Sequence, residues 1–376
     1  MGEGIGDRVS RVLSTHPVAD GHNDLLWQAR QLAAYDWDTL DLARGCPQTQ
    51  TDLPRLRAGR VGAQFWSVYV PATLPPERIV AATLEQIDAV HSMVRRYAAD
   101  LQLAHTADEV ERAMAAGRIA SLLGAEGGHS IAESLPVLRT LHRLGVRYLT
   151  LTHNTSTPWA DSATGERLHG GLTDFGRRAV REMNRLGMAV DLSHVSAETM
   201  RDALEVSHAP VIFSHSGARA VCESPRNVPD DVLSGLADRG GICMATFVPA
   251  FVSPTCWAWR QQAAQAARAE GIEATDLERF EPFTQGYAEQ HPPPTASLND
   301  VVQHIEHLRE VAGIDHIGLG GDYDGVAVQP EGLEDVSGYP NLLQALARRG
   351  FSDEDLGKIA SGNILRVMRE IEAVAD

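Results

Sequence analysis

Seven side chains that can bind a metal ion or carry a proton come directly after short apolar runs of the sequence. Two of them, His22 and Asp24, are two positions apart. Residues i and i+2 of an extended segment face the same side, so this imidazole and this carboxylate can ligate one cation. An H-x-D triplet alone is a weak signal, because such triplets arise by chance. The signal strengthens because five further residues follow apolar runs in the same way: Glu126, His153, His194, His215 and Asp322.

The number of candidate ligands indicates two ions rather than one. A catalytic zinc normally keeps three protein ligands and an open position. Glu126 has two carboxylate oxygens and is the natural bridge between ions about 3.5 to 4 Å apart, which can share a hydroxide that is nucleophilic at neutral pH. The chain offers more ligands than one zinc needs: His22, Asp24, Glu126, His194 and His215.

The position of the only lysine excludes other chemistries. Many dinuclear barrel hydrolases bridge their metals with a carboxylated lysine. Lys358 falls in a predicted helix after the last predicted strand, so it cannot reach the other candidates. The same position excludes Schiff-base and pyridoxal phosphate chemistry. Glu126 is the remaining candidate for the bridge.

The elements that must position these residues recur regularly along the chain. Eight short apolar runs of strand type alternate with helical segments, which is the pattern of parallel βα units. One helix is predicted to begin after Thr173 as its N-cap and to end at Gly187. Eight units predict an α/β fold, a (β/α)8 TIM barrel formed by residues 1–376 as a single domain. The runs cover residues 17–21, 61–70, 119–125, 146–152, 188–193, 210–214, 241–247 and 316–321.

A barrel explains why the candidate residues follow the strands. The carboxyl ends of all barrel strands meet at one rim, where catalytic residues collect. One interval departs from the pattern, because residues 254–297 form a helical insertion between predicted strands seven and eight. Its loop emerges at the same rim, so covering the substrate, contacting a second subunit and plain decoration all remain open.

The composition is that of an ordinary globular protein, with 43% hydrophobic and 22% charged residues. Lys plus Arg total 33 against 50 Asp plus Glu. The formal net charge of −17 disfavours nucleic acid and anionic membranes as partners. No signal peptide and no run of about 18 apolar residues is visible, and the four cysteines lack a CxxC spacing. These features predict a cytoplasmic protein with reduced cysteines.

Six segments together resemble the membrane (renal) dipeptidases, a family of zinc-dependent peptidases with a (β/α)8 barrel. The soluble bacterial-type members are the better likeness, because the chain shows neither the signal peptide nor the lipid-anchor tail of the secreted relatives. The segments span the whole barrel: DGHNDL at 20–25, GAEGGHS at 124–130, LTHN at 151–154, VDLSHVS at 190–196, APVIFSHSGARAVCESPRNVPDDVL at 209–233 and GLGGDYDGV at 318–326.

The resemblance implies how the ligands divide between two zinc ions. His22, Asp24 and Glu126 would hold one ion. Glu126, His194 and His215 would hold the other.

The resemblance also implies three groups that act on the substrate. His153 would bind it and stabilise the oxyanion, and Asp322 would take the proton of the bridging hydroxide and deliver it to the leaving amine. Arg226 would bind the free carboxylate, since a guanidinium is the usual fork for a carboxylate. Cys222 and Cys256 fall where some relatives have a disulfide, so a bridge between them stays open.

Several further residues near or outside the rim receive plainer interpretations. His129 and Asp324 are expected to orient ligands. His304 and His307 are three apart on a helix before strand eight, a spacing that can bind metal. That helix is expected to face away from the rim, so helix packing or surface exposure is favoured for both.

The prediction for the whole chain is a dinuclear zinc dipeptidase. It would hydrolyse small dipeptides with a free C-terminal carboxylate, including L-Xaa-D-Xaa dipeptides, by attack of a metal-bridging hydroxide. A homodimer is left open. One alternative is a barrel amidohydrolase acting on another amide or a lactone, against which Arg226 weighs. Another is a binding protein that lost catalysis, against which the retention of Asp322 and His153 weighs.

Overall fold

Eight parallel strands close into a barrel within residues 4–376, the part of the chain that the computed structural model describes. The barrel closes because β2 pairs with β4 from Ala63 opposite Ala120 to Tyr69 opposite Glu126. The predicted (β/α)8 TIM barrel is confirmed. In spatial order its strands are β2 (Val61–Tyr69), β1 (Val18–Asn23), β9 (Ile317–Leu319), β8 (Ile242–Ala245), β7 (Val211–Ser216), β6 (Ala189–Asp191), β5 (Val146–Thr150) and β4 (Ile119–Glu126).

One additional short strand, β3 (Leu101–Leu103), was not predicted from the sequence. It pairs with the first residues of β4, with Leu101 opposite Ile119 and Leu103 opposite Ser121. β5 takes over the pairing with β4 from Leu123 onward. The extra strand therefore extends the sheet at the amino-terminal end of the barrel and does not interrupt its closure.

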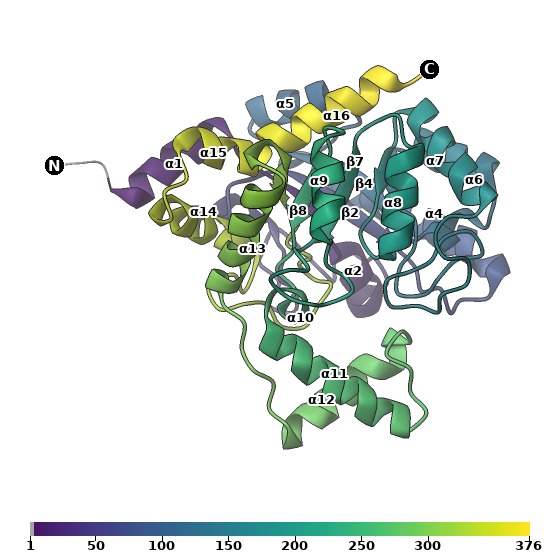
Figure 1. Ribbon diagram of the computed structural model, residues 1–376. Helices are drawn as coiled ribbons and strands as arrows, with labels where there is room; N and C mark the ends of the chain where they lie inside the picture. Colours follow the sequence, from purple (N-terminus) through teal and green to yellow (C-terminus); the bar gives the residue numbers. More distant parts are fainter. Residues whose placement is uncertain (1–3) are drawn as a thin grey trace.

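Helices surround the barrel (Figure 1). α1 (Ile5–Thr15) precedes the first strand, and α15 (Asp353–Gly357), a π-helical turn (Lys358–Gly362) and α16 (Asn363–Val374) end the chain. The helices between them are α2 (Leu25–Ala33), α3 (Leu53–Ala58), α4 (Pro76–Arg96), α5 (Ala107–Ala115), α6 (Leu135–Arg143), α7 (Asp174–Leu186), α8 (Ala197–Val206), α9 (Asp230–Ala237), α13 (Leu298–Val311) and α14 (Tyr339–Arg348). Short 3-10 turns cover Gly128–Ile131, Ile314–His316 and Val336–Gly338.

The caps predicted for α7 are confirmed. The Thr173 side chain accepts a hydrogen bond from the backbone N–H of Gly176, which satisfies one of the free donors of the first turn. Gly187 ends the helix with φ of +68°, a left-handed conformation that costs glycine little. Between these caps, Val180 and Met183 lie on the buried face of the helix.

One aromatic side chain inside the barrel, that of Tyr148, extends to the candidate site. Tyr148 on β5 is fully buried, and it passes directly over Gly124 on β4. A Cβ atom at Gly124 would lie 1.9 Å from the ring of Tyr148, so only glycine fits. The phenol oxygen of Tyr148 reaches the imidazole Nδ1 of His22 on β1, 2.8 Å away.

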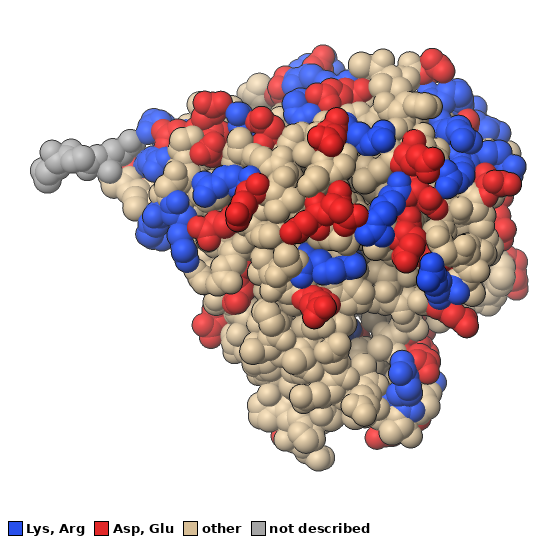
Figure 2. Space-filling view, viewed as in Figure 1, with Lys and Arg blue, Asp and Glu red and all other residues tan. Residues whose placement is uncertain are grey.

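Between β8 and β9 the chain leaves the barrel as α10 (Pro249–Val252), α11 (Pro254–Ala269) and α12 (Leu277–Gln290). Figure 1 shows α11 and α12 as a hairpin that projects from the barrel. The two helices are joined by an ion pair of 2.6 Å between Arg260 and Glu281, and the Arg260 guanidinium lies over the ring of Phe280. On the face seen in Figure 2, acidic and basic side chains alternate over the barrel helices, while most of the hairpin is uncharged.

Cys222 and Cys256 are free thiols, as are Cys46 and Cys243, and all four are buried. The disulfide that the resemblance left open is therefore not formed in this structure. Among the helices of residues 4–376, none has both the length and the apolar character needed to cross a membrane.

Candidate active site

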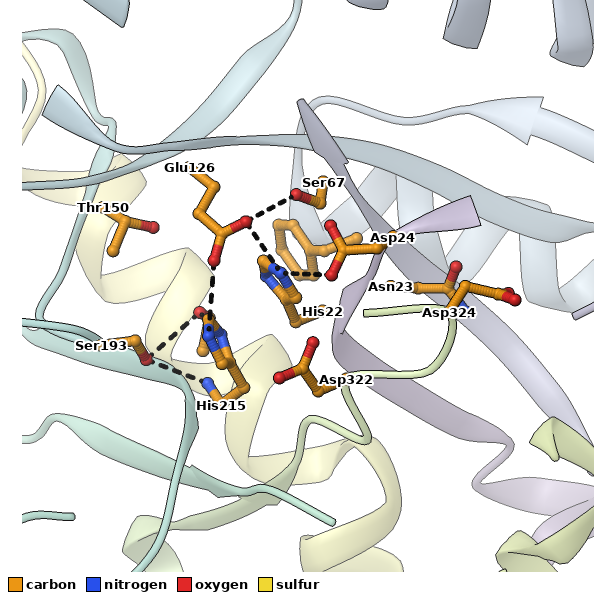
Figure 3. A network of polar contacts seen from close by, with 12 residues as sticks. His22, Asn23, Asp24, Ser67, Glu126, Thr150, Ser193, His215, Asp322 and Asp324 are labelled. Atoms are coloured by element: carbon orange, nitrogen blue, oxygen red, sulfur yellow. Dashed lines mark hydrogen bonds and ion pairs between the residues drawn. The ribbon is translucent and has the colours of Figure 1, made fainter. Parts of the chain in front are cut away.

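The candidate ligands converge at the carboxyl ends of the barrel strands, as the sequence predicts. His22 and His215 are the second-to-last residues of β1 and β7, and Glu126 is the final residue of β4. Figure 3 shows their side chains, with Asp24 and Asp322, pointing toward one another. His153 and His194 follow β5 and β6 and reach the same cluster.

The two carboxylate oxygens of Glu126 face different histidines. Oε1 lies 3.1 Å from Nε2 of His194 and 3.6 Å from Nε2 of His215. Oε2 lies 3.5 Å from Nε2 of His22 and accepts a hydrogen bond of 3.2 Å from Ser67 Oγ. Burial disfavours the charged carboxylate, but the surrounding imidazoles outweigh it and hold the pKa of Glu126 well below its usual value. One oxygen of the carboxylate therefore faces His194 and His215, and the other faces His22.

Asp24 and Asp322 form the other acidic side of the cluster. Asp24 Oδ2 lies 3.4 Å from Nε2 of His22, and the ligand atoms of His22, Asp24 and Asp322 all lie within 4.8 Å of one another. Gly325 packs against both carboxylates, because a Cβ atom there would lie 2.3 Å from Asp322 Oδ1 and 2.4 Å from Asp24 Oδ2. Burial, together with the neighbouring carboxylates of Asp24 and Glu126, raises the pKa of Asp322 well above its usual value.

Three of the candidate ligand histidines, His22, His194 and His215, each have a partner for Nδ1, which leaves Nε2 turned to the centre of the cluster. The partner of His22 is the Tyr148 hydroxyl at 2.8 Å, which donates to Gly21 O. The partner of His194 is Asn154 Oδ1 at 3.1 Å, and that of His215 is Ser214 Oγ at 2.8 Å. Such contacts fix the orientation of a ligating imidazole and select its Nε2 as the donor atom.

The donor set fits zinc, which takes imidazole nitrogen and carboxylate oxygen. The buried atoms His22 Nε2 and Asp24 Oδ1 have no hydrogen-bond partner. The Nε2 atoms of His194 and His215 approach within 3.0 Å of each other. Buried polar atoms are normally paired, so this group of unpaired and mutually facing donors indicates a site built for cations.

His153 also reaches the cluster, since its ligand atom and those of Glu126 and His194 all lie within 4.8 Å of one another. Its Nε2 is 3.8 Å from Glu126 Oε1, farther than the ring nitrogens of His194 and His215. The ring packs against Tyr69, with centroids 4.7 Å apart. Burial lowers the pKa of His153 to about 4, so the imidazole is neutral at neutral pH and can donate one N–H.

Arg226 is a buried guanidinium with hydrogen-bonding capacity to spare. Its residue is 2% exposed, and its charge lies 4.9 Å from the ring centroid of Phe251. Nη2 donates a long hydrogen bond of 3.4 Å to His215 O, while Nε and Nη1 have no partner. Burial lowers the pKa of Arg226 to about 10, which leaves the side chain charged at neutral pH. An unpaired buried cation of this kind is suited to an anionic ligand group.

Two residues expected to orient ligands make specific contacts. His129 Nε2 donates to Val70 O at 2.7 Å. Asp324 Oδ1 accepts a hydrogen bond of 2.6 Å from the backbone N–H of Gln50, and burial raises the pKa of Asp324 to about 7. Neither of these hydrogen bonds reaches a candidate metal ligand, so the orienting role of His129 and Asp324 stays a prediction.

His304 requires a correction. His304 packs inside the protein, as one of the two favoured interpretations predicts. The helix does not face away from the rim at this residue, however, because His304 contacts loops that follow the barrel strands. His304 is fully buried, accepts the backbone N–H of Ala218 at 2.9 Å and donates to Val252 O at 3.2 Å. It thereby joins the loop after β7, which carries Arg226, to α10. His307 lies nearer the surface and contacts Asp230 at 2.9 Å.

Three non-glycine residues at the rim have left-handed backbone conformations: φ is +69° at His194, +56° at Asp322 and +67° at Asp324. Such conformations are costly for residues with a Cβ atom and persist where the surroundings impose them. Strained backbone conformations of this kind cluster at functional sites, so their concentration here supports a functional role for this rim.

Sequence reasoning missed the residues that hold the ligands. All but Asn154, which follows β5, are polar side chains inside otherwise apolar strands. The sequence does contain this signal, because a buried polar residue needs a partner. Asp191 and Ser214 lie in the motifs VDLSH and FSHS beside His194 and His215. The others are Asp20, Tyr148, Thr150 and Asn154.

Comparison with known proteins identifies the family of the chain. The family model described as membrane dipeptidase (peptidase family M19) matches residues 6–376. The fold is similar to that of the probable dipeptidase PvdM from Pseudomonas aeruginosa, with 22% identity and a TM-score of 0.86 over 99% of each chain.

Two further solved structures are 26% identical to the chain. One is a metallopeptidase of family M19 described as dipeptidase AC, with a TM-score of 0.79 over 95% of this chain and 98% of that one. The other is a metallopeptidase from Rhodobacter sphaeroides liganded with a phosphinate mimic of L-Ala-D-Ala, with a TM-score of 0.78 over 95% and 99%. The chain belongs to the membrane dipeptidase family, peptidase family M19, and is a metallo-dipeptidase.

Proposed function

We propose that this metallo-dipeptidase holds two zinc ions and cleaves dipeptides with a free C-terminal carboxylate, L-Xaa-D-Xaa dipeptides among them. The family implies zinc. The observation that carries the count of two is the position of Glu126, whose oxygens face different histidines at 3.1 and 3.5 Å. A single ion would leave one of these groups without a partner.

The proposed ligands form two sets that share Glu126. His22, Asp24 and Glu126 hold one ion, and Glu126, His194 and His215 hold the other. When bound, the ions supply a nucleophile at neutral pH by acidifying water, and they polarise the scissile carbonyl.

Asp322 is the proposed proton carrier. Its carboxylate lies within 4.8 Å of the ligand atoms of His22 and Asp24, where it can reach the attacking water. It accepts a proton from that water and delivers it to the leaving amine, which is a poor leaving group unless protonated. The absence of a Cβ atom at Gly325 leaves room for the carboxylate in this position.

His153 and Arg226 are the proposed substrate contacts. The neutral imidazole of His153 donates its N–H to the carbonyl oxygen, where negative charge develops during attack. The free N–H groups of Arg226 bind the terminal carboxylate. With the carbonyl and the carboxylate both fixed, one residue fits after the cleaved bond. A D-residue at that position is supported by the L-Ala-D-Ala mimic bound to the Rhodobacter sphaeroides metallopeptidase.

The test is turnover of a substrate panel by protein loaded with zinc. The panel contains L-Ala-D-Ala, L-Ala-L-Ala, the tripeptide of L-alanine and C-terminally amidated L-Ala-D-Ala. The proposal predicts cleavage of both free dipeptides and little cleavage of the tripeptide or the amide. Rapid cleavage of the amide or the tripeptide with an inert L-Ala-D-Ala would contradict it.

A further inference from the structure

The ring of His215 is held by a chain of two further side chains that ends on a buried carboxylate. Ser214 Oγ lies 2.8 Å from His215 Nδ1 and 2.7 Å from Asp191 Oδ2. Asp191, Ser214 and His215 are all fully buried, so water does not compete for these contacts. The Thr150 hydroxyl also donates to Asp191, and Ser193 Oγ accepts the backbone N–H of His215 (Figure 3).

The Ser214 hydroxyl has a single proton, and the acceptor of that proton determines the donor and acceptor roles in this chain of hydrogen bonds. Its nearest acceptor is the carboxylate oxygen Asp191 Oδ2 at 2.7 Å, while His215 Nδ1 is 2.8 Å and Ser193 Oγ 3.4 Å away. A hydroxyl that donates to the carboxylate presents its lone pairs elsewhere, so it accepts from His215 Nδ1–H. His215 is therefore held in the tautomer whose Nε2 carries the lone pair that a metal needs.

Asp191 is placed to keep this role. Oδ1 accepts the backbone N–H groups of Ser193 at 3.1 Å and Ser214 at 2.8 Å. Oδ2 accepts the hydroxyls of Thr150 at 2.5 Å and Ser214 at 2.7 Å. These four donors fix the position of the buried carboxylate between β5 and β7.

The other two proposed ligand histidines lack support from a carboxyl group of this kind. The Nδ1 atom of His22 contacts the Tyr148 hydroxyl, which donates a hydrogen bond to the backbone carbonyl of Gly21. The Nδ1 atom of His194 contacts the neutral side-chain amide of Asn154. A carboxyl group that holds the Ser214 hydroxyl as an acceptor fixes the orientation of the His215 imidazole and raises its basicity as a ligand. Its Nε2 faces His194 Nε2 at 3.0 Å and Glu126 Oε1 at 3.6 Å.

We propose that Ser214, backed by Asp191, is a positioning residue that fixes His215 as an Nε2 ligand and so sets the affinity for the ion of Glu126, His194 and His215. The inference rests on the proposed two-ion centre. Without the hydroxyl, the His215 ring can carry its proton on Nε2 and donate it to His194 or Glu126. A metal ion must then displace that proton before it binds.

The variant Ser214→Ala removes the hydroxyl and leaves both backbone bonds to Asp191 in place. Ser193→Ala is the matched control, because Ser193 Oγ accepts the backbone N–H of His215 at 3.1 Å and does not touch its ring. Zinc affinity is measured by competition with a chromophoric chelator. We expect wild type and Ser193→Ala to bind two ions alike, and Ser214→Ala to bind one of them about 10- to 100-fold more weakly.

A second readout is taken without metal. In protein labelled with ¹⁵N-histidine, the ring nitrogens of His215 should report the Nδ1–H tautomer in wild type and in Ser193→Ala. Ser214→Ala should gain the Nε2–H tautomer. This signal tests the role of Ser214 even if wild type binds one ion, an outcome that would refute the two-ion centre instead. Wild-type tautomer and zinc affinity in Ser214→Ala, or equal losses in both variants, would overturn the inference.

Discussion

Replacing Arg226 with Met should lower activity without lowering stability, because the guanidinium makes only one long hydrogen bond in the protein without substrate. Nε and Nη1 have no partner, and the one hydrogen bond, to His215 O, is 3.4 Å long. Burial lowers the pKa from 12.5 to about 10. At 1.36 kcal/mol per pKa unit, burial therefore opposes the charged form by about 3 kcal/mol.

The expected change in stability follows from two opposing contributions. Met removes the cost of burying the charge, about 3 kcal/mol, and loses the contact of the cation with Phe251, worth about 2 kcal/mol when desolvated. Met also keeps most of the buried volume. We therefore expect the free energy of unfolding of Arg226→Met, measured in urea on metal-free protein, to equal or exceed that of wild type by about 1 kcal/mol.

Activity should fall in the same variant. Truncating one partner of a buried, hydrogen-bonded charge pair costs about 2 to 5 kcal/mol. At 1.36 kcal/mol per factor of ten, kcat/KM for L-Ala-D-Ala should drop roughly 30- to 5000-fold. Wild type should lose a comparable factor with the amidated dipeptide, and Arg226→Met should no longer distinguish the acid from the amide.

Arg219→Met is the control, since Arg219 follows the same strand but already donates to Asn227 O and Pro225 O. It should keep the discrimination between the acid and the amide. The reasoning is refuted if Arg226→Met still prefers the free acid as strongly as wild type does. It is equally refuted if Arg226→Met loses several kcal/mol of stability, because the guanidinium would then be a structural group.

Further predictions concern protons and thiols. Asp322→Asn should retain both metals and bind substrate while kcat falls about 10²- to 10⁴-fold, and a fall of less than tenfold in steady-state kinetics would assign the proton transfer to another group. His153→Asn should also lower kcat, with metal content unchanged by elemental analysis; loss of an ion would make His153 a ligand. Burial lowers the pKa of His304 to about 4, against 6.5 when unfolded, so the unfolded chain takes up the proton first and stability falls as pH drops from 6.5 toward 4. His304→Gln should remove up to about 3 kcal/mol of that fall in urea titrations at pH 7 and pH 4.5, and an unchanged slope would contradict it. Thiol titration of denatured, unreduced protein should find all four cysteines free; a count of two would show that a disulfide forms and would contradict this.

The barrel and its rim could be predicted because their signals are local. A strand buried on both faces is a continuous apolar run, and the residue after it must lie at the carboxyl end of the barrel. His22, Glu126 and His215 were found in this way. β3 was missed because Leu101–Leu103 has only three residues and pairs with the start of one neighbour.

The support of the ligands was not predicted because it depends on pairings between distant strands. Asp191 meets Thr150 because the two are opposite each other in the register of β5 and β6, and it meets Ser214 across the next pairing. No spacing along the chain reveals such contacts. His304 was misplaced for the same reason, since a helical period gives the face of a helix but not the loops that cover it.

The central claim is a centre of two ions bridged by Glu126, and metal content tests it most directly. Elemental analysis of protein reconstituted with zinc and freed of excess metal should give two ions per chain for wild type. Glu126→Gln should lose both, because Glu126 lies within 3.6 Å of His22, His194 and His215. One ion per fully reconstituted wild-type chain, or two ions retained by Glu126→Gln, would contradict the account.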